Sequence, residues 1–540
     1  MTARRAELAA IRFGTDGWRA LIADAFTFEN VERVAQAYAD YLRQQHDERV
    51  RAEHAADEAK HHAAQVSDER HRAAHDERAD SSPEGGFPTA DAPARIHDDD
   101  ELASSAPPAP APDVPFVVVG YDRRFLSERF AARAAEVLNG NGAHVALFET
   151  DVPTPLVSWA VREQGAAGGV VITASHNPAD FNGFKIKAPF GGSATPEMTV
   201  AVEALVDTRP PQRESLPADG RASQEALYTS VETYRAQVAS YVELERLRAT
   251  KARVVVDPMH GAGGRWVESF LQGGALEVET IRAERDPLFG GVAPEPIERN
   301  LAPLMRRVSE TGALVGLATD GDADRVGAVS DAGQTMTMHE VVPLILLHLA
   351  RRRGMTGGVV RTFSQSVLVR RIAAAHDLTL HETPIGFKYV ADLMLRENIL
   401  IGAEESGGIG VQGHIPERDG ILNSLLFLEA VVAAGKRPTE LVAEMHREFG
   451  AFYFGRRDLH TEVAGGLALV AALADSPPAE VAGHEVVGVE KLDGTKLLFA
   501  DESWLLFRQS GTEPVLRVYA EATSTAKRDA LLERGCALAD

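Results

Sequence analysis

The stretch LVGLATDGDADR, residues 314–325, joins a short apolar run at 314–318 to a polar loop with three aspartates. An uninterrupted apolar run of this length is typical of a parallel strand that is buried on both faces of its sheet. Comparable runs alternate along the chain with stretches of helical spacing, which predicts βαβ units and an α/β fold. The other predicted strands are 116–120, 144–149, 169–173, 253–257, 359–362, 378–381 and 399–402.

The C-terminal part of the chain has a different pattern. Two further runs, 504–507 and 515–519, flank a polar loop and are followed by a helical stretch. We therefore expect a smaller α+β domain after the α/β domains. The length of 540 residues agrees with several domains, because a single hydrophobic core stops growing well below that size.

The composition excludes several classes of protein. Hydrophobic residues make up 44% and charged residues 25% of the chain, which excludes a wholly disordered or fibrous protein. The net charge of −23 argues against nucleic acid or an anionic membrane as the main partner. No apolar run could span a bilayer and the first residues do not resemble a secretory signal, so the cytoplasm is the expected compartment. The single cysteine, Cys536, excludes an internal disulfide framework.

Residues 46–115 interrupt the first domain. From 46 to 80 the chain is rich in Ala, Glu, Asp, Arg and His, which suits either a solvated helix or a disordered segment. From 81 to 115 it is rich in Pro, Ala, Ser and Asp, which is a linker composition. We interpret 46–115 as a low-complexity, mainly disordered insertion, and His61 and His62 as solvated residues rather than metal ligands.

Polar clusters follow several of the predicted strands. They are TASHNP at 173–178, DGDADR at 320–325, EESG at 404–407 and RQSGT at 508–512. Ligands of α/β sheets bind beyond the carboxyl ends of the strands. We therefore expect one site that is assembled from loops of several domains.

The DGDADR cluster predicts a metal site. In an extended loop, Asp320, Asp322 and Asp324 would share one face, and three converging carboxylates favour a hard cation such as Mg²⁺. A calcium EF-hand is excluded, because Arg325 and Asp331 occupy the positions that need glycine and glutamate. A solvated acidic turn is the alternative.

The TASHNP cluster contains a candidate nucleophile. Ser175 lies at a strand end before Pro178, where it could be an exposed nucleophile or could simply cap a helix. His176 is ambiguous as a lone histidine. Lys185, further along, is a candidate base or anion binder whose pKa neighbouring cations could lower.

The RQSGT cluster predicts a phosphate site. Arg508, and Arg517 on the next strand, offer planar donor groups that suit phosphate. Gly511 allows backbone N–H groups to approach a ligand, and Ser510 and Thr512 add hydroxyl donors. A hairpin turn without a ligand is the alternative.

The EESG cluster, with Glu404 and Ser406, suits sugar hydroxyls. A GxGxxG match at 408–413 and the glycine-rich loop at 260–264 lack the context of dinucleotide sites. Taken alone, the four clusters predict phosphate, a metal and a hydroxylated ligand. They do not separate phosphoryl transfer from hydrolysis.

Together the four clusters resemble, in order, the phosphoserine, metal, sugar and phosphate loops of the α-D-phosphohexomutase family. FGTDGWR at 13–19 and GYDRR at 120–124 are also similar to family segments. The resemblance covers the chain apart from 46–115. It implies three related α/β domains with mixed sheets and a small, mobile fourth domain around a central cleft. The expected domains are 1–215, 216–335, 336–448 and 449–540.

The resemblance also implies a chemistry. Ser175 would be phosphorylated in the active enzyme, would share Mg²⁺ with the three aspartates, and would exchange its phosphoryl group with a hexose phosphate through a hexose 1,6-bisphosphate. Lys185 is the preferred acid/base residue, and His176 and Arg325 are assigned with it to catalysis. The residues assigned to the substrate are Arg19, Arg124, Gly386, Lys388, Glu404, Ser406, Arg418, Arg508, Ser510, Gly511, Thr512 and Arg517.

Two segments bear on the sugar. TPIGFK at 383–388 and HIPERDG at 414–420 resemble glucose-type loops, with Arg418 where lysine is commoner. Dual-specificity and glucosamine mutases usually have histidine at the position of Gly408. We therefore expect a phosphoglucomutase with glucose 1,6-bisphosphate as intermediate and activator. The alternatives are a phosphomannomutase or dual-specificity mutase, a phosphoglucosamine mutase, a Mg²⁺-dependent sugar phosphatase and a non-catalytic sugar-phosphate sensor.

Overall fold

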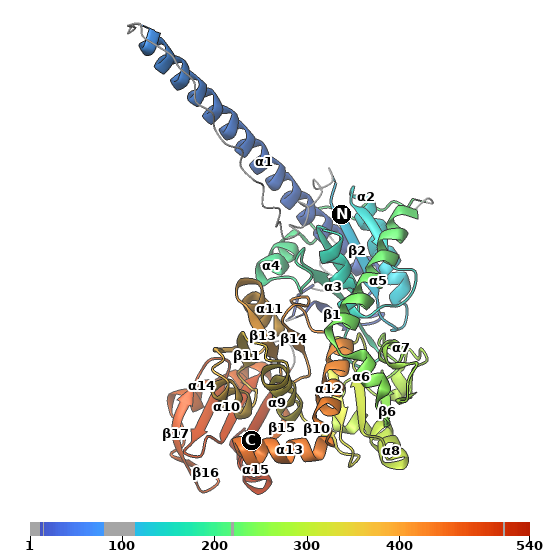
Figure 1. Ribbon diagram of the computed structural model, residues 1–540, viewed down its shortest axis with the longest axis vertical. Coiled ribbons are helices and arrows are strands. Elements are labelled where there is room, and N and C mark those ends of the chain that lie inside the picture. The colour runs from blue at the N-terminus through green and yellow to red at the C-terminus, as the bar shows by residue number, and fades with distance from the viewer. Residues whose placement is uncertain (1–10, 15, 80–113, 218–220, 511–513, 540) are drawn as a thin grey trace, which may run out of the picture.

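The computed structural model describes residues 11–14, 16–79, 114–217, 221–510 and 514–539. Within these ranges four sheets follow one another along the chain, and Figure 1 shows them gathered into one body from which a long helix projects. The first three sheets mix parallel and antiparallel strands, and the fourth is antiparallel. The expected fold class, three α/β domains followed by a smaller α+β domain, is confirmed.

The first sheet has the strand order β1-β5-β4-β2-β3. Strand β2 pairs in parallel with β3 and β4, as their apolar runs predict, and β5 and β1 add antiparallel strands. The sequence did not predict β5, because its buried side chains include Asn182, Lys185 and Lys187 and its pattern is not apolar. The elements are β1 (Trp18–Leu21), α1 (Phe28–Ala79), β2 (Phe116–Tyr121), α2 (Ser127–Gly140), β3 (His144–Leu147), α3 (Thr154–Glu163), β4 (Gly168–Ile172), β5 (Phe181–Lys187) and α4 (Pro196–Leu205).

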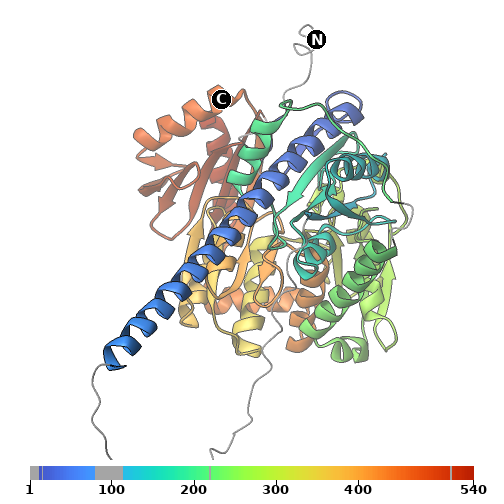
Figure 2. The same cartoon turned by 90° about the horizontal axis from the view of Figure 1, so that it is seen from above.

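Helix α1 contains both a packed and a projecting part. Val31, Val34, Tyr38 and Leu42 are buried against the first domain, whereas the side chains of residues 51–56 are exposed. Figures 1 and 2 show that the second part leaves the body of the molecule. The structure describes this segment up to Ala79 as a continuation of helix α1, which is the solvated-helix alternative for 46–80. The expected linker at 81–115 falls mostly outside the described residues.

The second sheet has the order β10-β9-β8-β6-β7. Its centre is again parallel, since β6 pairs with β7 and β8, and β9 turns back antiparallel to β8. The aspartate loop is the β8–β9 connection. The elements are α5 (Arg221–Tyr241), α6 (Leu244–Ala249), β6 (Arg253–Asp257), α7 (Trp266–Leu271), β7 (Glu277–Thr280), η2 (Phe289–Gly291), η3 (Glu298–Asn300), α8 (Ala302–Thr311), β8 (Val315–Thr319), β9 (Val326–Val329) and β10 (Thr335–Met336).

The third sheet has the order β12-β11-β13-β14. Strand β11 pairs in parallel with β12 and β13, and the sugar loop 404–408 connects β13 to antiparallel β14. The elements are α9 (Met338–Leu347), the π-helical turn η4 (His348–Arg352), β11 (Gly358–Thr362), α10 (Val367–Ala375), β12 (Leu380–Thr383), α11 (Phe387–Arg396), β13 (Ile399–Ala403), β14 (Ile409–Val411), α12 (Gly420–Ala434) and α13 (Pro438–Phe449).

The fourth sheet has the order β15-β20-β19-β18-β17-β16. The phosphate loop lies between β19 and β20, which are paired antiparallel neighbours. The elements are β15 (Tyr453–His460), α14 (Val463–Asp475), β16 (Glu480–Val481), β17 (His484–Glu490), β18 (Thr495–Phe499), β19 (Trp504–Gln509), β20 (Val515–Ala522) and α15 (Thr525–Ala539).

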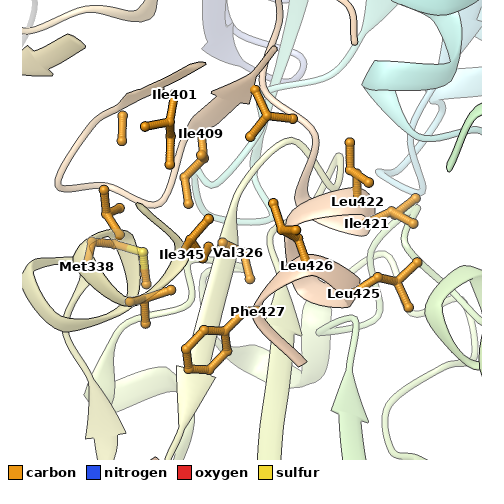
Figure 3. Close-up of a cluster of buried hydrophobic side chains, with 14 of the residues drawn as sticks. Val326, Met338, Ile345, Ile401, Ile409, Ile421, Leu422, Leu425, Leu426 and Phe427 are labelled. Carbon is orange, nitrogen blue, oxygen red and sulfur yellow. The ribbon is translucent and has the colours of Figure 1, made fainter. Parts of the chain in front are cut away.

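A shared apolar core joins the second and third domains. Helix α12 is buried along most of its length, and Figure 3 shows its residues Leu422 and Leu426 in the same cluster as Val326 of β9 and Ile409 of β14. Burying a leucine of this kind stabilises the fold by about 1.5–3 kcal/mol. The core therefore holds the aspartate loop and the sugar loop, which flank Val326 and Ile409, in a fixed relation. Among the described helices, none is long and apolar enough to cross a membrane.

Candidate active site

A cleft of about 1040 Å³ lies between the four domains. Each domain contributes side chains to its wall, so the site is assembled from distant parts of the chain as expected. The predicted residues that line it are Arg19, His176, Arg325, Gly386, Lys388, Glu404, Ser406, Arg418, Arg508, Ser510 and Arg517. Gly511 and Thr512 lie outside the described residues.

Ser175 lies directly behind this wall. It follows β4 in the left-handed backbone region, with φ 52°, and its side chain is fully buried. Ser175 is therefore not exposed in this arrangement, because the aspartate loop covers it, and its role as a nucleophile stays a prediction. A Cβ added at Gly321 would lie only 2.4 Å from the Ser175 carbonyl oxygen, so the two loops are in close contact.

Arg124 supports the loop that contains Ser175 through hydrogen bonds to its backbone. Its guanidinium donates to the carbonyl oxygens of Ser175 at 2.7 Å, Asn177 at 2.6 Å, Pro178 at 2.7 Å and Phe181 at 3.0 Å. The side chain is fully buried and is not part of the cleft wall. Its two Nη groups are bonded to the backbone of the serine loop and its Nε lies 3.2 Å from Asp122 Oδ2, so Arg124 supports this loop here, and its assignment to the substrate stays a prediction.

The three aspartates converge as the sequence predicts. One carboxylate oxygen of each lies within 4.8 Å of the others, and Ser175 Oγ donates to Asp320 Oδ2 at 3.0 Å. Their convergence does not come from an extended loop, because Ala323 has a left-handed φ of 60° and the segment turns. The buried oxygens Asp322 Oδ1 and Asp324 Oδ1 have no hydrogen-bond partner among the described residues. Such a set of hard oxygen ligands fits a divalent cation.

Burial and mutual repulsion dominate the electrostatics of this cluster. Burial, together with the charges of Asp324 and Asp322, raises the pKa of Asp320 well above its usual value. Burial also opposes ionisation of Asp322, but the Lys185 cation outweighs it and lowers the pKa of Asp322. Lys185 and Arg325 therefore do not fully neutralise the three aspartates, and a bound cation would reduce the repulsion that remains.

Lys185 is a buried cation in contact with three carboxylates. Its Nζ lies 2.7 Å from Asp16, 2.9 Å from Asp322 and 3.1 Å from Asp324. Burial lowers the pKa of Lys185, but these carboxylates outweigh burial and raise it overall. The expected lowering of its pKa is therefore wrong, because the nearest groups are anions and not cations.

His176 and Arg325 flank the serine on the cleft side. His176 Nδ1 is 3.4 Å from Ser175 Oγ, and burial followed by the charge of Arg325 keeps the pKa of His176 well below its usual value. The imidazole is therefore neutral. Arg325 Nε lies 3.9 Å from both Asp320 and Asp324, and its side chain faces the cleft.

Asp16 is a site residue that the sequence analysis missed. Its Oδ2 binds Arg418 at 2.6 Å and Lys185 at 2.7 Å, and it is 3.6 Å from Arg19. Although it is buried, these cations lower its pKa. Its place in FGTDGWR, three residues before Arg19, is the signal that could have found it.

The sugar-loop residues surround Arg418. This arginine binds Asp324 at 2.8 Å and lies 3.5 Å from Glu404, so it connects the aspartate loop to the sugar loop. Burial raises the pKa of Glu404 to about 7, although Arg418 and Arg325 oppose the rise. Glu404 Oε2 has no hydrogen-bond partner in the described part of the chain and is a ready acceptor for a sugar hydroxyl.

The fourth domain supplies a positively charged wall. Besides the predicted Arg508 and Arg517, three further arginines line the cleft there, and the sequence analysis did not single them out. Two of them lie on β15, far in sequence from the RQSGT motif and beside β20 in the sheet, and the third lies on α15, which packs against β15 and β20. Together they create a local positive field in an acidic protein, as an anionic substrate requires. The three are Arg456, Arg457 and Arg528.

Comparison with known families finds matches in all four domains. The α/β/α domains I, II and III of phosphoglucomutase/phosphomannomutase match residues 106–213, 232–333 and 338–449. The C-terminal domain of phosphoglucomutase/phosphomannomutase matches residues 468–536.

Individual relatives carry several names. A phosphoglucomutase/phosphomannomutase of Thermococcus kodakarensis is 32% identical over 424 residues, which is 78% of this chain and 90% of the relative. A phosphoglucosamine mutase of Halorhodospira halophila is 30% identical over 77% of this chain and 86% of its own length. The crystal structure of a putative phosphomannomutase from Thermus thermophilus superposes with a TM-score of 0.75 at 33% identity, covering 98% of this chain and 99% of that one.

Proposed function

Because the chain belongs to the phosphoglucomutase/phosphomannomutase family of isomerases, we propose that it interconverts glucose 1-phosphate and glucose 6-phosphate. The observation that carries this proposal is the hydroxyl of Ser175, which is bonded to the aspartate cluster directly behind a cleft lined by a sugar loop and a group of arginines. We also propose that the four domains have the bounds predicted from the sequence.

Ser175 is the proposed carrier of the phosphoryl group. In the first half-reaction the bond between phosphorus and Ser175 Oγ breaks, and a bond forms to the free hydroxyl of the hexose phosphate, whose proton is released. This gives glucose 1,6-bisphosphate. After the bisphosphate turns over, Ser175 accepts the other phosphoryl group. Lys185 is the proposed acid/base residue, because its Nζ lies beside two of the aspartates near the serine; its raised pKa keeps it protonated, so it would act first as the acid.

The aspartate cluster is the proposed magnesium site. Asp320, Asp322 and Asp324, with the phosphorylated Ser175, would hold the ion, and their unpartnered oxygens support this assignment. When bound, Mg²⁺ supplies positive charge that stabilises a transferring phosphoryl group. Arg325 faces the same region from the cleft and adds a fixed cation.

The cleft wall of the fourth domain is the proposed binding site for the phosphate that does not react. Arg508, Ser510 and Arg517 line the cleft there. Glu404 and Ser406 line it on the third domain and would bind the sugar hydroxyls. Phosphoryl transfer depends mainly on positioning and charge stabilisation, which this arrangement can provide.

The identity of the sugar is proposed from the sugar loop. A Cβ at Gly408 would lie 2.4 Å from Arg418 Cδ, so Arg418 fills the space that a larger residue would need. The loop therefore has the glucose-type combination of a small residue at 408 and a cation at 418. This combination favours glucose over the mannose and glucosamine named for several relatives.

The test compares glucose 1-phosphate, mannose 1-phosphate and glucosamine 1-phosphate, each with Mg²⁺ and a trace of the matching bisphosphate. We expect the highest kcat/KM for glucose 1-phosphate. A preference for either other sugar would overturn the substrate and leave the mutase mechanism. Steady release of inorganic phosphate without an isomeric product would indicate a phosphatase, and no turnover of any substrate would favour a sensor.

The nucleophile is tested by Ser175→Ala. We expect this variant to lose activity by about a thousandfold or more while it remains folded, because no acceptor for the phosphoryl group is left. Ser240→Ala is the matched control, since Ser240 is exposed on α5 and bonds only its own helix among the described residues. Retained activity in Ser175→Ala would contradict the assignment.

A further inference from the structure

One carboxylate links the sugar-specificity loop to the phosphate-binding arginine. Asp493 lies in the turn between β17 and β18 of the fourth domain. Its Oδ2 accepts a hydrogen bond from the backbone N–H of Ile385 at 2.8 Å and another from Arg508 Nε at 3.0 Å. Ile385 belongs to the loop 383–388 of the third domain, so this single oxygen bridges two domains and two proposed binding loops.

The turn is held firmly against Arg508. Gly494 has a φ of 99°, which a side chain would strain, and a Cβ there would lie 2.3 Å from the Phe507 carbonyl oxygen. The next residue, Thr495, pairs with Phe507 in the sheet. The backbone of Asp493 therefore has little freedom relative to Arg508, and mainly the orientation of the Asp493 carboxylate can change.

The bond to Nε leaves the outer edge of the guanidinium available. Among the described residues, no acceptor is bonded to the two Nη groups of Arg508, and the side chain faces the cleft. A guanidinium held by one carboxylate at Nε is oriented for a phosphate at its Nη groups. Burial disfavours the charged form of Arg508, but Asp493 outweighs burial and raises its pKa, so the cation is maintained.

On the other side, the bond from Ile385 fixes the start of the specificity loop. Gly386 follows with a φ of 140° and is the N-cap of helix α11, and Lys388 faces the cleft two residues later. The orientation of the Asp493 carboxylate therefore depends on the conformation of this loop.

A second contact keeps the third and fourth domains together without Asp493. Glu521 of β20 is fully buried and accepts bonds from His339 Nδ1 at 2.8 Å, Ser366 Oγ at 2.6 Å and the Val367 N–H at 2.9 Å, all in the third domain. Asp493 has a partly exposed side chain, 23% accessible. Removing its carboxylate should therefore leave the domains attached and change only the aim of Arg508.

We propose that Asp493 is a positioning residue that orients the Arg508 guanidinium toward the phosphate that does not react. Through its bond to Ile385, this orientation would depend on the conformation of the sugar-specificity loop, 383–388. This inference rests on the proposed function of the cleft. It assigns Asp493 an effect on phosphate binding that acts through Arg508.

A double-mutant cycle with glucose 1-phosphate tests the kinetic part. Asp493→Ala should lower kcat/KM by about 10- to 100-fold, and Asp493→Asn, which keeps an acceptor for Ile385, should lie between it and the wild type. In an Arg508→Ala background, Asp493→Ala should cost less than about twofold. Equal losses in both backgrounds, or an unchanged kcat/KM in Asp493→Ala, would overturn the proposal. Asp475→Asn is the control, because Asp475 is an exposed carboxylate of the same domain that pairs with Lys491.

Amide hydrogen exchange at Ile385 tests the same contact without turnover. We expect exchange to be about tenfold faster in Asp493→Ala and unchanged in Asp475→Asn. Unchanged exchange in Asp493→Ala would show that the bond is not formed in solution and would overturn the proposal. If the wild type turns over no hexose phosphate, the proposed function fails, and inorganic phosphate replaces the substrate in a binding version of the cycle. There, Asp493→Ala must weaken phosphate binding only when Arg508 is present.

Discussion

Replacing Gly408 by alanine would place a Cβ 2.4 Å from Arg418 Cδ and 2.9 Å from Glu404 Oε2. Arg418 cannot easily yield, because its guanidinium is bonded to Asp16 at 2.6 Å and to Asp324 at 2.8 Å. The added methyl group must therefore displace a side chain that is anchored at its far end. Overpacking of this kind costs about 1–3 kcal/mol.

The displacement should lower activity as well as stability. If Arg418 loses its contact with Asp324 or Glu404 in the reacting complex, kcat/KM should fall by about 10- to 100-fold, because each factor of ten corresponds to about 1.4 kcal/mol. The assay is the formation of glucose 6-phosphate from glucose 1-phosphate, with Tm measured in parallel. Gly488→Ala is the matched control, since a Cβ there meets Leu498 only at ordinary contact distances of 3.4–4.0 Å.

A second variant, Arg418→Ala, tests whether the loss in Gly408→Ala comes from the steric contact with Arg418. In Arg418→Ala, which is itself impaired, adding alanine at 408 should cost less, because the closest atom, Arg418 Cδ, is gone and only the contact with Glu404 Oε2 at 2.9 Å remains. Wild-type kcat/KM and Tm in Gly408→Ala would refute the reasoning. So would an equal loss of kcat/KM in the wild-type and Arg418→Ala backgrounds.

Two other predictions concern pH and the insertion. Burial raises the pKa of Glu404 from 4.5 to about 7, so the folded state binds this proton more tightly than the unfolded state does, and the stabilisation is present below pH 4.5 and lost as the pH rises through 7. Glu404→Gln cannot ionise, so its free energy of unfolding relative to the wild type should increase between about pH 5 and about pH 8, by up to about 3 kcal/mol. Denaturant titrations at several pH values measure this, and a difference in free energy of unfolding that does not change with pH would contradict the pKa shift. A chain in which a short Gly/Ser linker replaces 46–115 should keep kcat/KM within about twofold, because the helix projects from the body and its side chains at 51–56 are exposed. An unfolded or inactive product would show that this segment is structural.

The sequence alone was sufficient for the parallel strands that are buried on both faces and for the loops that follow them. Parallel strands buried on both faces must be apolar throughout, so β2, β4, β6, β8, β11 and β13 can be recognised from a few consecutive residues. The clusters around Ser175, Asp320, Glu404 and Arg508 are recognisable for a related reason, since polar residues at strand ends are where ligands bind.

Local sequence patterns did not predict the structure where a charged side chain is buried because it binds a partner from a distant part of the chain. Strand β5 was missed because Lys185 and Lys187 are buried in it, each bonded to a carboxylate of another domain: Lys185 to Asp322 and Lys187 to Glu417. Arg124 was assigned to the substrate from the resemblance of GYDRR at 120–124 to a family segment. Its actual partners are four carbonyl oxygens of the serine loop, which no local pattern encodes.

The ionisable residues of the site show most clearly what the sequence determines and what the tertiary structure determines. The sequence determined which ionisable residues exist and that they follow strands, because both are local properties of the chain. Only the tertiary structure decided which of them meet: Asp16 and Arg418 are 402 positions apart and form a bond of 2.6 Å. The strength of such a pair depends on distance and burial, and these are set by how the domains pack and not by the neighbouring residues in the chain.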